Sequence, residues 1–236
     1  MKLGIIIPTY RKPDGSTYNH VKNTLLSVKK QTHQDYKVFL IGDKYEDNEE
    51  FKELSKIIDS DKIVSVNLDI AVERGVYKGL DLWVCGGVNA HNHGVELAIS
   101  EGYNYICHLD HDDWYLENHL ENISNAIDLT GTHFLSTYCG EWPVENGFKG
   151  DSFINDKLSK FIPLRNKIFK VTTCVDYLYY NFRMRNMVKE FGKVYASDAD
   201  LWDRIGSDMI QKNEYGVLIN ENTCGRAPGK SVLKYY

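Results

Sequence analysis

Hydrophobic positions in the first part of the chain alternate between short continuous runs and stretches with helical spacing. Short apolar runs are typical of buried strands, and they occur at residues 3–8, 36–41, 62–68 and 103–109. Apolar residues three or four positions apart predict helices between these runs, over residues 18–31, around residues 51–58 and from Gly86-Gly87 to Gly102. Strands that alternate with helices predict an α/β fold, with a mostly parallel sheet covered by helices on both faces.

The second part of the chain has a less regular pattern. It predicts strands at residues 134–138 and 167–175, a long polar surface loop over residues 144–160, a short helix ending at Gly192 and a helix at residues 199–205 behind Asp198. We find no internal repeat, low-complexity tract or linker in the sequence. We therefore expect a single domain over residues 1–236.

Polar residues directly follow three of the predicted strands. Pro8-Thr9-Tyr10 follow the first strand, Asp43 follows the second, and Asp110, Asp112 and Asp113 follow the fourth. Ligands of open α/β sheets bind beyond the carboxyl ends of the strands. These residues are therefore predicted to meet in one binding site.

The three aspartates after the fourth strand are the strongest chemical signal in the sequence. Carboxylates crowded at the end of a buried strand repel one another, and a divalent cation such as Mg²⁺ or Mn²⁺ relieves that repulsion while also holding phosphate oxygens. On an extended backbone, Asp110 and Asp112 would face one ligand while His111 faces away. The alternative is a polar turn whose last aspartate caps the following helix.

Composition and charge exclude several other classes of protein. The net charge is −5 and no long basic stripe is present, which disfavours nucleic-acid binding. The five cysteines form no C-x-x-C pair and are expected to be reduced thiols, as in the cytoplasm. No segment reaches the ~20 apolar residues of a membrane span, and we see no signal peptide. Any contact with a membrane is expected to be peripheral or through a partner.

Five segments, in order, resemble glycosyltransferase family 2, the inverting enzymes of the GT-A fold. They are similar to the family's nucleotide loop, base-reading strand, glycine-rich stretch, D-x-D segment and late acidic motif, at residues 5–10, 39–43, 86–94, 108–114 and 198–204. The resemblance implies a Rossmann-like, mostly parallel sheet flanked by helices. It also implies a nucleotide-binding half at residues 1–114 and a less regular acceptor-binding half at residues 115–236.

The resemblance implies transfer of a hexose or pentose from a nucleotide sugar, UDP-linked in most of the family, to a glycan or lipid-linked acceptor. It implies that Asp43 accepts a hydrogen bond from the base, that Tyr10 packs near that ring, and that Mn²⁺ or Mg²⁺ binds Asp112 and Asp110. The residues expected to contact the donor are Pro8, Thr9, Tyr10, Asp43, Arg74, Asn92 and Asp110. Arg74 would reach the phosphates or the sugar, unless it is a solvated loop residue.

In the same resemblance, Asp198 is the general base that takes the proton from the acceptor hydroxyl. Two alternatives remain: Asp198 caps the helix behind it, or Asp200 is the base. The family's C-terminal histidine is replaced here by Ala227, so Arg226 or Lys230 would contact phosphate, or water would complete the metal shell. The second-strand motif is Gly-Asp-Lys, with one carboxylate where many members have two.

Other assignments compete with sugar transfer. The first is a catalytically inactive protein of the same fold that binds a nucleotide sugar or a glycan, and the missing histidine keeps it open. A nucleotidyltransferase would need a glycine cluster after the first strand, which the sequence lacks. A zinc site at His91 and His93 is disfavoured, because residues two apart on a helix do not share a face.

Overall fold

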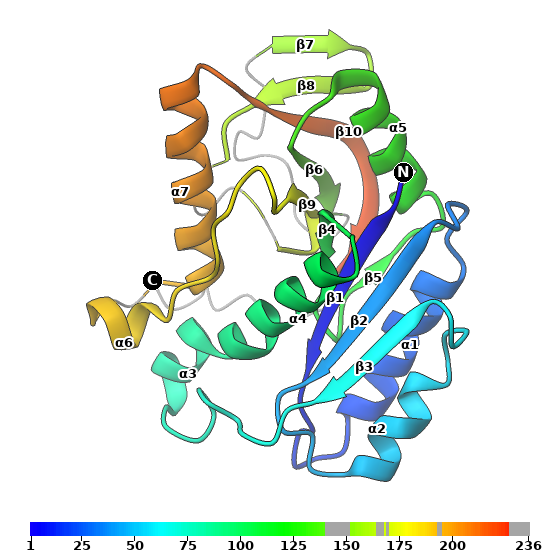
Figure 1. Cartoon of the computed structure of the whole chain (residues 1–236), viewed down its shortest axis with the longest axis vertical. Coiled ribbons are helices and arrows are strands. Elements are labelled where there is room, and N and C mark those ends of the chain that lie inside the picture. The colour runs from blue at the N-terminus through cyan, green and yellow to red at the C-terminus, as the bar shows by residue number, and fades with distance from the viewer. Residues whose placement is uncertain (140–151, 164–167, 169, 193–194, 227–236) are drawn as a thin grey trace.

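The computed structural model describes residues 1–139, 152–163, 168, 170–192 and 195–226. In this part of the chain, ten strands form one mixed sheet in the order β3-β2-β1-β4-β9-β6-β10-β8-β7, with β5 paired to β10. Helices cover both faces of the sheet (Figure 1). The α/β fold with a mostly parallel central sheet flanked by helices is therefore confirmed.

The N-terminal half of the sheet is wholly parallel. Its strands are β1 (Leu3–Thr9), β2 (Tyr36–Gly42), β3 (Ile63–Asn67) and β4 (Tyr105–His108). Strand β1 lies between β2 and β4, with Leu3 opposite both Tyr36 and Tyr105. Because helices cover both faces, β1 and β2 read as continuous apolar runs in the sequence.

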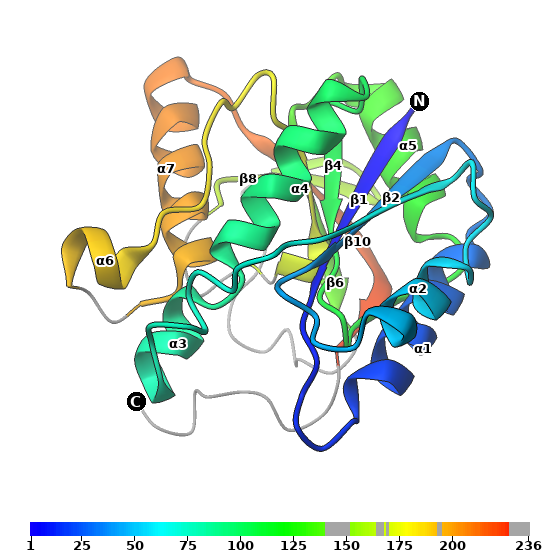
Figure 2. The same cartoon turned by 60° about the horizontal axis from the view of Figure 1, so that its bottom comes forward.

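Two layers of helices bury the two faces of this sheet. Helices α1 (Thr17–Lys29), α2 (Asn48–Ser55) and α5 (His119–Thr130) pack on one face, and α4 (Val88–Ser100) and α7 (Ser197–Lys212) on the other. Successive side chains of β1 divide between these layers: Ile5 and Ile7 join the core under α1, and Ile6 joins the core under α4. Figure 2 shows α4 and α1 on opposite sides of β1 and β2.

The C-terminal half of the sheet is mixed. It contains β5 (Trp114–Tyr115), β6 (Phe134–Cys139), β7 (Ser152–Asn155), β8 (Leu158–Phe161), β9 (Thr173–Asp176) and β10 (Gly216–Gly225). Strand β9 runs antiparallel to both β4 and β6, and β10 runs parallel to β6. A short helix, α6 (Met187–Phe191), ends at Gly192 as predicted, with Gly192 in the left-handed conformation.

Two predicted elements differ from the structure. The polar loop expected at residues 144–160 contains the hairpin β7–β8, whose turn is held by the Asn155 side chain accepting from Lys157 and Leu158, while residues 140–151 lie outside the described residues. The strand expected at residues 167–175 is a 3₁₀ turn (Lys170–Thr172) followed by the short β9.

The structure also contains elements that were not predicted, among them β5, β10 and α3 (Gly79–Cys85). Helix α3 has only seven residues. Its apolar side chains are exposed at Leu80 and Trp83 and buried at Val84 and Cys85. So short a segment gives no clear helical periodicity in the sequence. None of the described helices is long and apolar enough to cross a bilayer.

Gly94 determines how closely α4 lies on the sheet. A Cβ atom at this position would meet Ile6 Cγ2 at 2.8 Å and Ile41 Cγ1 at 3.2 Å. Both neighbours are buried β-branched side chains, which have little freedom to move. The helix therefore rests on β1 and β2 at a distance that only glycine permits.

We expect Gly94→Ala to destabilise the protein by about 1 kcal/mol. Overpacking costs about 1–3 kcal/mol, and the better helix propensity of alanine recovers up to about 1 kcal/mol. Urea unfolding measures the difference, and His93→Ala, on the exposed side of the same helix, is the matched control. Equal or higher stability of Gly94→Ala would contradict this close packing.

Candidate active site

A cavity of about 420 Å³ opens at the carboxyl ends of β1, β2 and β4. The residues predicted after these three strands all line it, which confirms that they meet at one edge of the sheet. Its other walls come from α3, from the turn into α4 and from two basic residues of the second half. The full lining is Pro8, Thr9, Tyr10, Lys12, Asp43, Arg74, Gly79, Leu82, Trp83, Gly86, Gly87, Asp110, His111, Asp112, Asp113, Lys170 and Arg226.

Asp43 occupies one end of the cavity and is only 2% exposed. Its backbone N–H donates to the Thr9 carbonyl at 2.7 Å, which ties the end of β2 to the end of β1. The Oδ2 atom accepts from Arg74 Nε at 2.9 Å, whereas the buried Oδ1 atom has no hydrogen-bond partner among the described residues. A buried carboxylate oxygen in this state can accept an N–H from a ligand.

Arg74 organises this end of the cavity. It also donates to Glu46 Oε1 at 3.1 Å and to the Lys44 carbonyl at 3.0 Å, and its guanidinium lies 4.8 Å from the centre of the Tyr10 ring. Arg74 is thus not a solvated loop residue, because its side chain donates hydrogen bonds to the segment from Asp43 to Glu46. Arg74 also lines the cavity, and its contact with the phosphates or the sugar stays a prediction.

Glu73 is a buried acid beside Arg74 that the sequence analysis missed. Its Oε1 atom accepts from the Asn89 backbone N–H at 3.2 Å, near the start of α4. Burial, together with the charge of Asp43, raises the pKa of Glu73 to about 7. Glu73 therefore connects the turn that carries Arg74 to α4.

The acidic segment at the other end of the cavity is a turn. The Asp113 N–H donates to the Asp110 carbonyl at 3.1 Å, and Thr24 of α1 donates its hydroxyl to the Asp113 carbonyl at 2.7 Å. The expected alternation is therefore wrong: Asp110, His111, Asp112 and Asp113 all line the cavity. The capping alternative is also wrong, because β5 follows the turn and α5 begins only at His119.

Basic side chains accompany each of the three aspartates. Lys170 forms an ion pair with Asp110, Lys12 Nζ lies 3.8 Å from Asp112 Oδ2, and Arg226 Nε lies 3.9 Å from Asp113 Oδ2. Burial alone would raise the pKa of Asp110, but Lys170 more than offsets it and the pKa is lowered. Lys12 and Lys170 were not singled out in the sequence, because no motif marks them.

The acidic end has donors suited to a divalent cation. Among the described residues, no three His, Cys, Asp or Glu side chains converge so as to hold a metal by themselves. Mg²⁺ commonly binds through one or two carboxylates together with substrate phosphates and water. The carboxylates of Asp112 and Asp110 fit that mode of binding, in which the substrate supplies the remaining oxygens.

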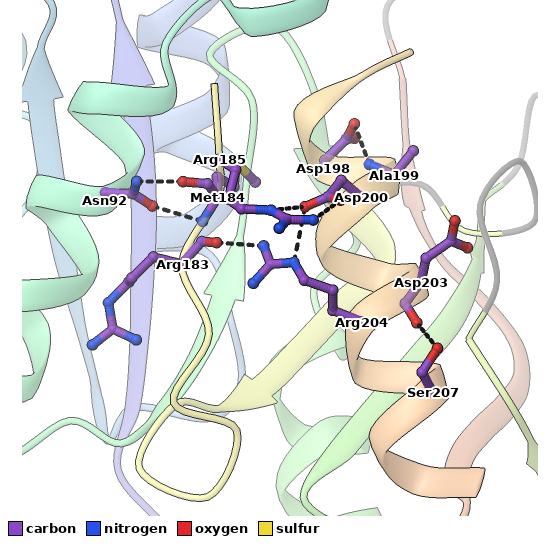
Figure 3. A network of polar contacts seen from close by, with 10 residues as sticks. All are labelled: Asn92, Arg183, Met184, Arg185, Asp198, Ala199, Asp200, Asp203, Arg204 and Ser207. Carbon is purple, nitrogen blue, oxygen red and sulfur yellow. Dashed lines mark hydrogen bonds and ion pairs between the residues drawn. The ribbon is translucent and has the colours of Figure 1, made fainter. Parts of the chain in front are cut away.

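Asp198 and Asp200 have different environments, although both lie in the first turn of α7 (Figure 3). Asp198 is half-buried and accepts from the Ala199 N–H at 2.8 Å, within the helix rather than at its N-cap. Burial raises the pKa of Asp198, and the nearby charge of Lys170 offsets part of that rise. Asp198 is not among the residues that line the cavity, but it interacts electrostatically with two that are, Lys170 and Asp110.

Asp200 is engaged by two arginines. Arg185 Nε and Arg204 Nε donate to its Oδ2 atom at 2.9 Å and 2.8 Å, and Arg185 donates a second hydrogen bond to Oδ1. Burial would raise the pKa of Asp200, but the two arginines lower it below its usual value. A carboxylate held in this way is a poor proton acceptor, so the geometry disfavours Asp200 as the base.

Asn92 lies outside the cavity lining. Its side chain donates to the Met184 carbonyl at 2.8 Å and accepts from the Met184 N–H at 3.0 Å, which fastens the segment before α6 to α4 (Figure 3). His91 is buried and stacks on His108, whereas His93 is exposed. Ala227 and Lys230 lie outside the described residues.

No family model matches the chain. An uncharacterized glycosyltransferase of Acanthamoeba polyphaga mimivirus is 31% identical over 232 residues, which cover 95% of this chain and 93% of that protein.

Solved glycosyltransferase structures share the fold. S. aureus TarS in complex with UDP-GlcNAc superimposes with a TM-score of 0.65 at 13% identity, over 100% of this chain and 62% of that chain. A mannosyltransferase from Pyrobaculum calidifontis, in complex with GDP-Man and Mn²⁺, gives a TM-score of 0.65 at 10% identity, over 98% of this chain and 58% of that chain. The chain thus spans less than two thirds of these solved relatives.

Asp198 and Asp200, in the first turn of α7, should respond differently to substitution. Asp200→Asn leaves Arg185 and Arg204 without their charge partner, and we expect a loss of about 2 kcal/mol in the free energy of unfolding. Because the pKa of Asp200 is lowered in the folded state, this stabilisation is present above the ordinary carboxyl pKa and disappears as the pH falls through the folded pKa. Asp198→Asn should leave stability unchanged or increase it, because burial disfavours that charge.

Urea unfolding of both variants at neutral and acidic pH tests this difference. Asp208→Asn, which breaks the more exposed pair with Lys212 on the same helix, is the control and should cost at most about 0.5 kcal/mol. Equal effects of Asp200→Asn and Asp208→Asn would contradict the structural role of Asp200.

Proposed function

Because the chain belongs to the glycosyltransferases, we propose that it is an inverting, metal-dependent hexosyl- or pentosyltransferase of family 2. The proposed donor is a UDP-sugar, and the proposed acceptor is a hydroxyl group of a glycan or of a lipid-linked sugar. In this proposal residues 1–114 bind the donor and residues 115–236 bind the acceptor. Within the second half, residues 138–185 determine which acceptor is bound.

The observation that carries the proposal is the chemical difference between the two ends of one cavity. One end presents a single buried carboxylate, Asp43, with an oxygen that has no hydrogen-bond partner among the described residues. The other end presents carboxylates interleaved with lysine and arginine. A nucleoside diphosphate has the matching polarity, because its base carries N–H donors and its diphosphate carries anionic oxygens.

The end of the cavity that contains Asp43, here called the base end, would recognise uracil. The N–H group of uracil would donate a short charge-assisted hydrogen bond to Asp43 Oδ1. Arg74 orients the Asp43 carboxylate by donating a hydrogen bond to its other oxygen. Tyr10, which lies under the Arg74 guanidinium, supplies a flat surface beside the base. The buried Thr9 hydroxyl, which has no hydrogen-bond partner among the described residues, is a further group that can contact the nucleoside.

The diphosphate end would hold the leaving group. A divalent cation bound by Asp112 and Asp110 would neutralise charge on the diphosphate as it departs. Lys12, Lys170 and Arg226 line the same end and can donate hydrogen bonds to phosphate oxygens. Lys170 must exchange part of its contact with Asp110 when the donor binds.

Asp198 is the proposed general base. The acceptor oxygen attacks the anomeric carbon opposite the diphosphate, the carbon–oxygen bond to the diphosphate breaks with its electron pair leaving on the nucleoside diphosphate, and the acceptor proton passes to Asp198. This single displacement inverts the anomeric centre. The raised pKa of Asp198 suits this role, because it makes the carboxylate a stronger base.

We expect nucleotide binding to require the acidic end of the cavity. In a thermal-shift panel of nucleoside diphosphates and nucleotide sugars with Mn²⁺, a UDP compound at about one hundred times its dissociation constant should stabilise the protein by about 2.7 kcal/mol. A chelator should abolish most of this shift, and Asp112→Ala should abolish the Mn²⁺-dependent part, because it removes a cation ligand.

The matched control is Asp128→Ala, an exposed aspartate of α5 outside the cavity, which should retain the full shift. Unchanged Mn²⁺-dependent affinity for UDP in Asp112→Ala would refute the metal assignment. A shift with guanine rather than uracil nucleotides would change the proposed donor and leave the rest intact.

We expect Asp198→Asn to bind the donor normally but to lose transfer by a factor of about 10² to 10⁴. In the wild type, kcat should fall as the pH drops through the pKa of Asp198, at a higher pH than for an ordinary carboxylate, because the base must be ionised. A radiolabelled sugar-transfer assay with donor-binding measurements separates the two effects. Wild-type turnover in Asp198→Asn would place the base elsewhere, and donor binding without transfer by the wild type would favour an inactive binding protein.

A further inference from the structure

Five large hydrophobic side chains are exposed in one short stretch beside the cavity. We call this stretch the apolar rim, and it consists of Ile70 (69% exposed), Val72 (43%), Val76 (71%), Leu80 (42%) and Trp83 (48%). Single exposed apolar residues are common on soluble proteins, but several together mark an interaction surface.

The apolar rim is held in place by buried groups. Glu73 and Arg74, at its centre, are anchored to α4 and to the Asp43 loop, and the Val76 and Tyr77 N–H groups both donate to the Glu73 carbonyl at 3.0 and 2.8 Å. On α3, Leu80 and Trp83 are three residues apart and share an exposed face, whereas Val84 and Cys85 are buried. These side chains therefore project from a fixed backbone.

The apolar rim is continuous with the mouth of the cavity. Trp83 belongs to both, and Gly79 and Leu82 from the same segment also line the cavity. Helix α3 packs beside α6, whose Phe191 is 44% exposed. Figure 2 shows α3 and α6 together on the side of the molecule from which α7 begins. A molecule lying on the apolar rim would thus border the mouth of the donor cavity.

Charge on this surface points to an uncharged partner surface. The exposed charged residues of the stretch are Asp69, Lys78 and Asp81, two of one sign and one of the other. This mixture of charges favours neither a strongly acidic nor a strongly basic partner. Exposed tryptophan together with aliphatic side chains is typical of segments that enter the interface of a lipid bilayer.

We propose that the apolar rim inserts into the interface of a lipid bilayer and turns the mouth of the cavity towards an acceptor held in that membrane. The part of this proposal that concerns the acceptor rests on the proposed function. The membrane contact does not, because it can be measured without any sugar transfer. It narrows the acceptor to a lipid-linked one.

The test is flotation of the full chain with vesicles of phosphatidylcholine, at low and at high salt. We expect the wild type to float at both, since apolar contact is not screened by salt. The double variant Ile70→Ser/Val76→Ser, which removes two residues that do not line the cavity, should bind vesicles about tenfold more weakly or worse. The control Leu178→Ser/Ile210→Ser removes two comparably exposed residues (58% and 64%) outside the apolar rim and should float like the wild type.

Three results would overturn the proposal: no flotation of the wild type, equal loss in the two double variants, or self-association that only Ile70→Ser/Val76→Ser abolishes. The last result, measured by sedimentation velocity, would assign the apolar rim to a second copy of the chain. The nucleotide thermal shift is measured on the same samples and should be unchanged in Ile70→Ser/Val76→Ser. Loss of flotation with an intact nucleotide shift therefore separates this proposal from the proposed function.

Discussion

The parallel pairing of β1 with both β2 and β4 is the constraint on which the rest of the structure depends. Because these strands point the same way, the residues that follow them emerge at the same edge of the sheet. The base end and the acidic end of the cavity are thus set about one strand to either side of β1. Helices α1 and α4 bury the two faces behind this edge, and Gly94 lets α4 lie close against β1 and β2.

The site balances negative charge with nearby positive charge throughout. Asp43 is paired with Arg74, Asp110 with Lys170, and Asp200 with two arginines. Asp198 differs from Asp110 and Asp200, because its pKa is raised whereas theirs are lowered, and its basic neighbour Lys170 acts from a distance. Asp198 and Asp200 share one helical turn but face different surroundings, because residues two apart on a helix do not share a face. Asp200 therefore stabilises the structure, and Asp198 is left available for the proposed proton transfer.

The second half of the chain supplies two of the basic residues that line the cavity, Lys170 and Arg226. Lys170 reaches the cavity from the turn before β9, which runs antiparallel to β4. Arg226 reaches it from just beyond β10, which runs antiparallel to β5. The apolar rim adds an exposed surface at the same mouth. The donor cavity thus lies on the same side of the molecule as the proposed base and the proposed membrane contact. Sugar transfer to an acceptor held in a bilayer requires this arrangement.

The sequence by itself determined the first four strands, helices α1, α2 and α4, and the meeting of Thr9, Asp43 and Asp110. These follow from local periodicity and from the rule that ligands bind at the carboxyl ends of parallel strands. Tertiary structure alone decided the partners: Arg74 with Asp43 across 31 residues, Asp200 with Arg185 across 15, and Lys170 with Asp110 in the acidic turn. It also decided that α3 exposes Leu80 and Trp83. Such contacts join residues distant in the chain, and side-chain pairing of this kind leaves no periodic signal in the sequence.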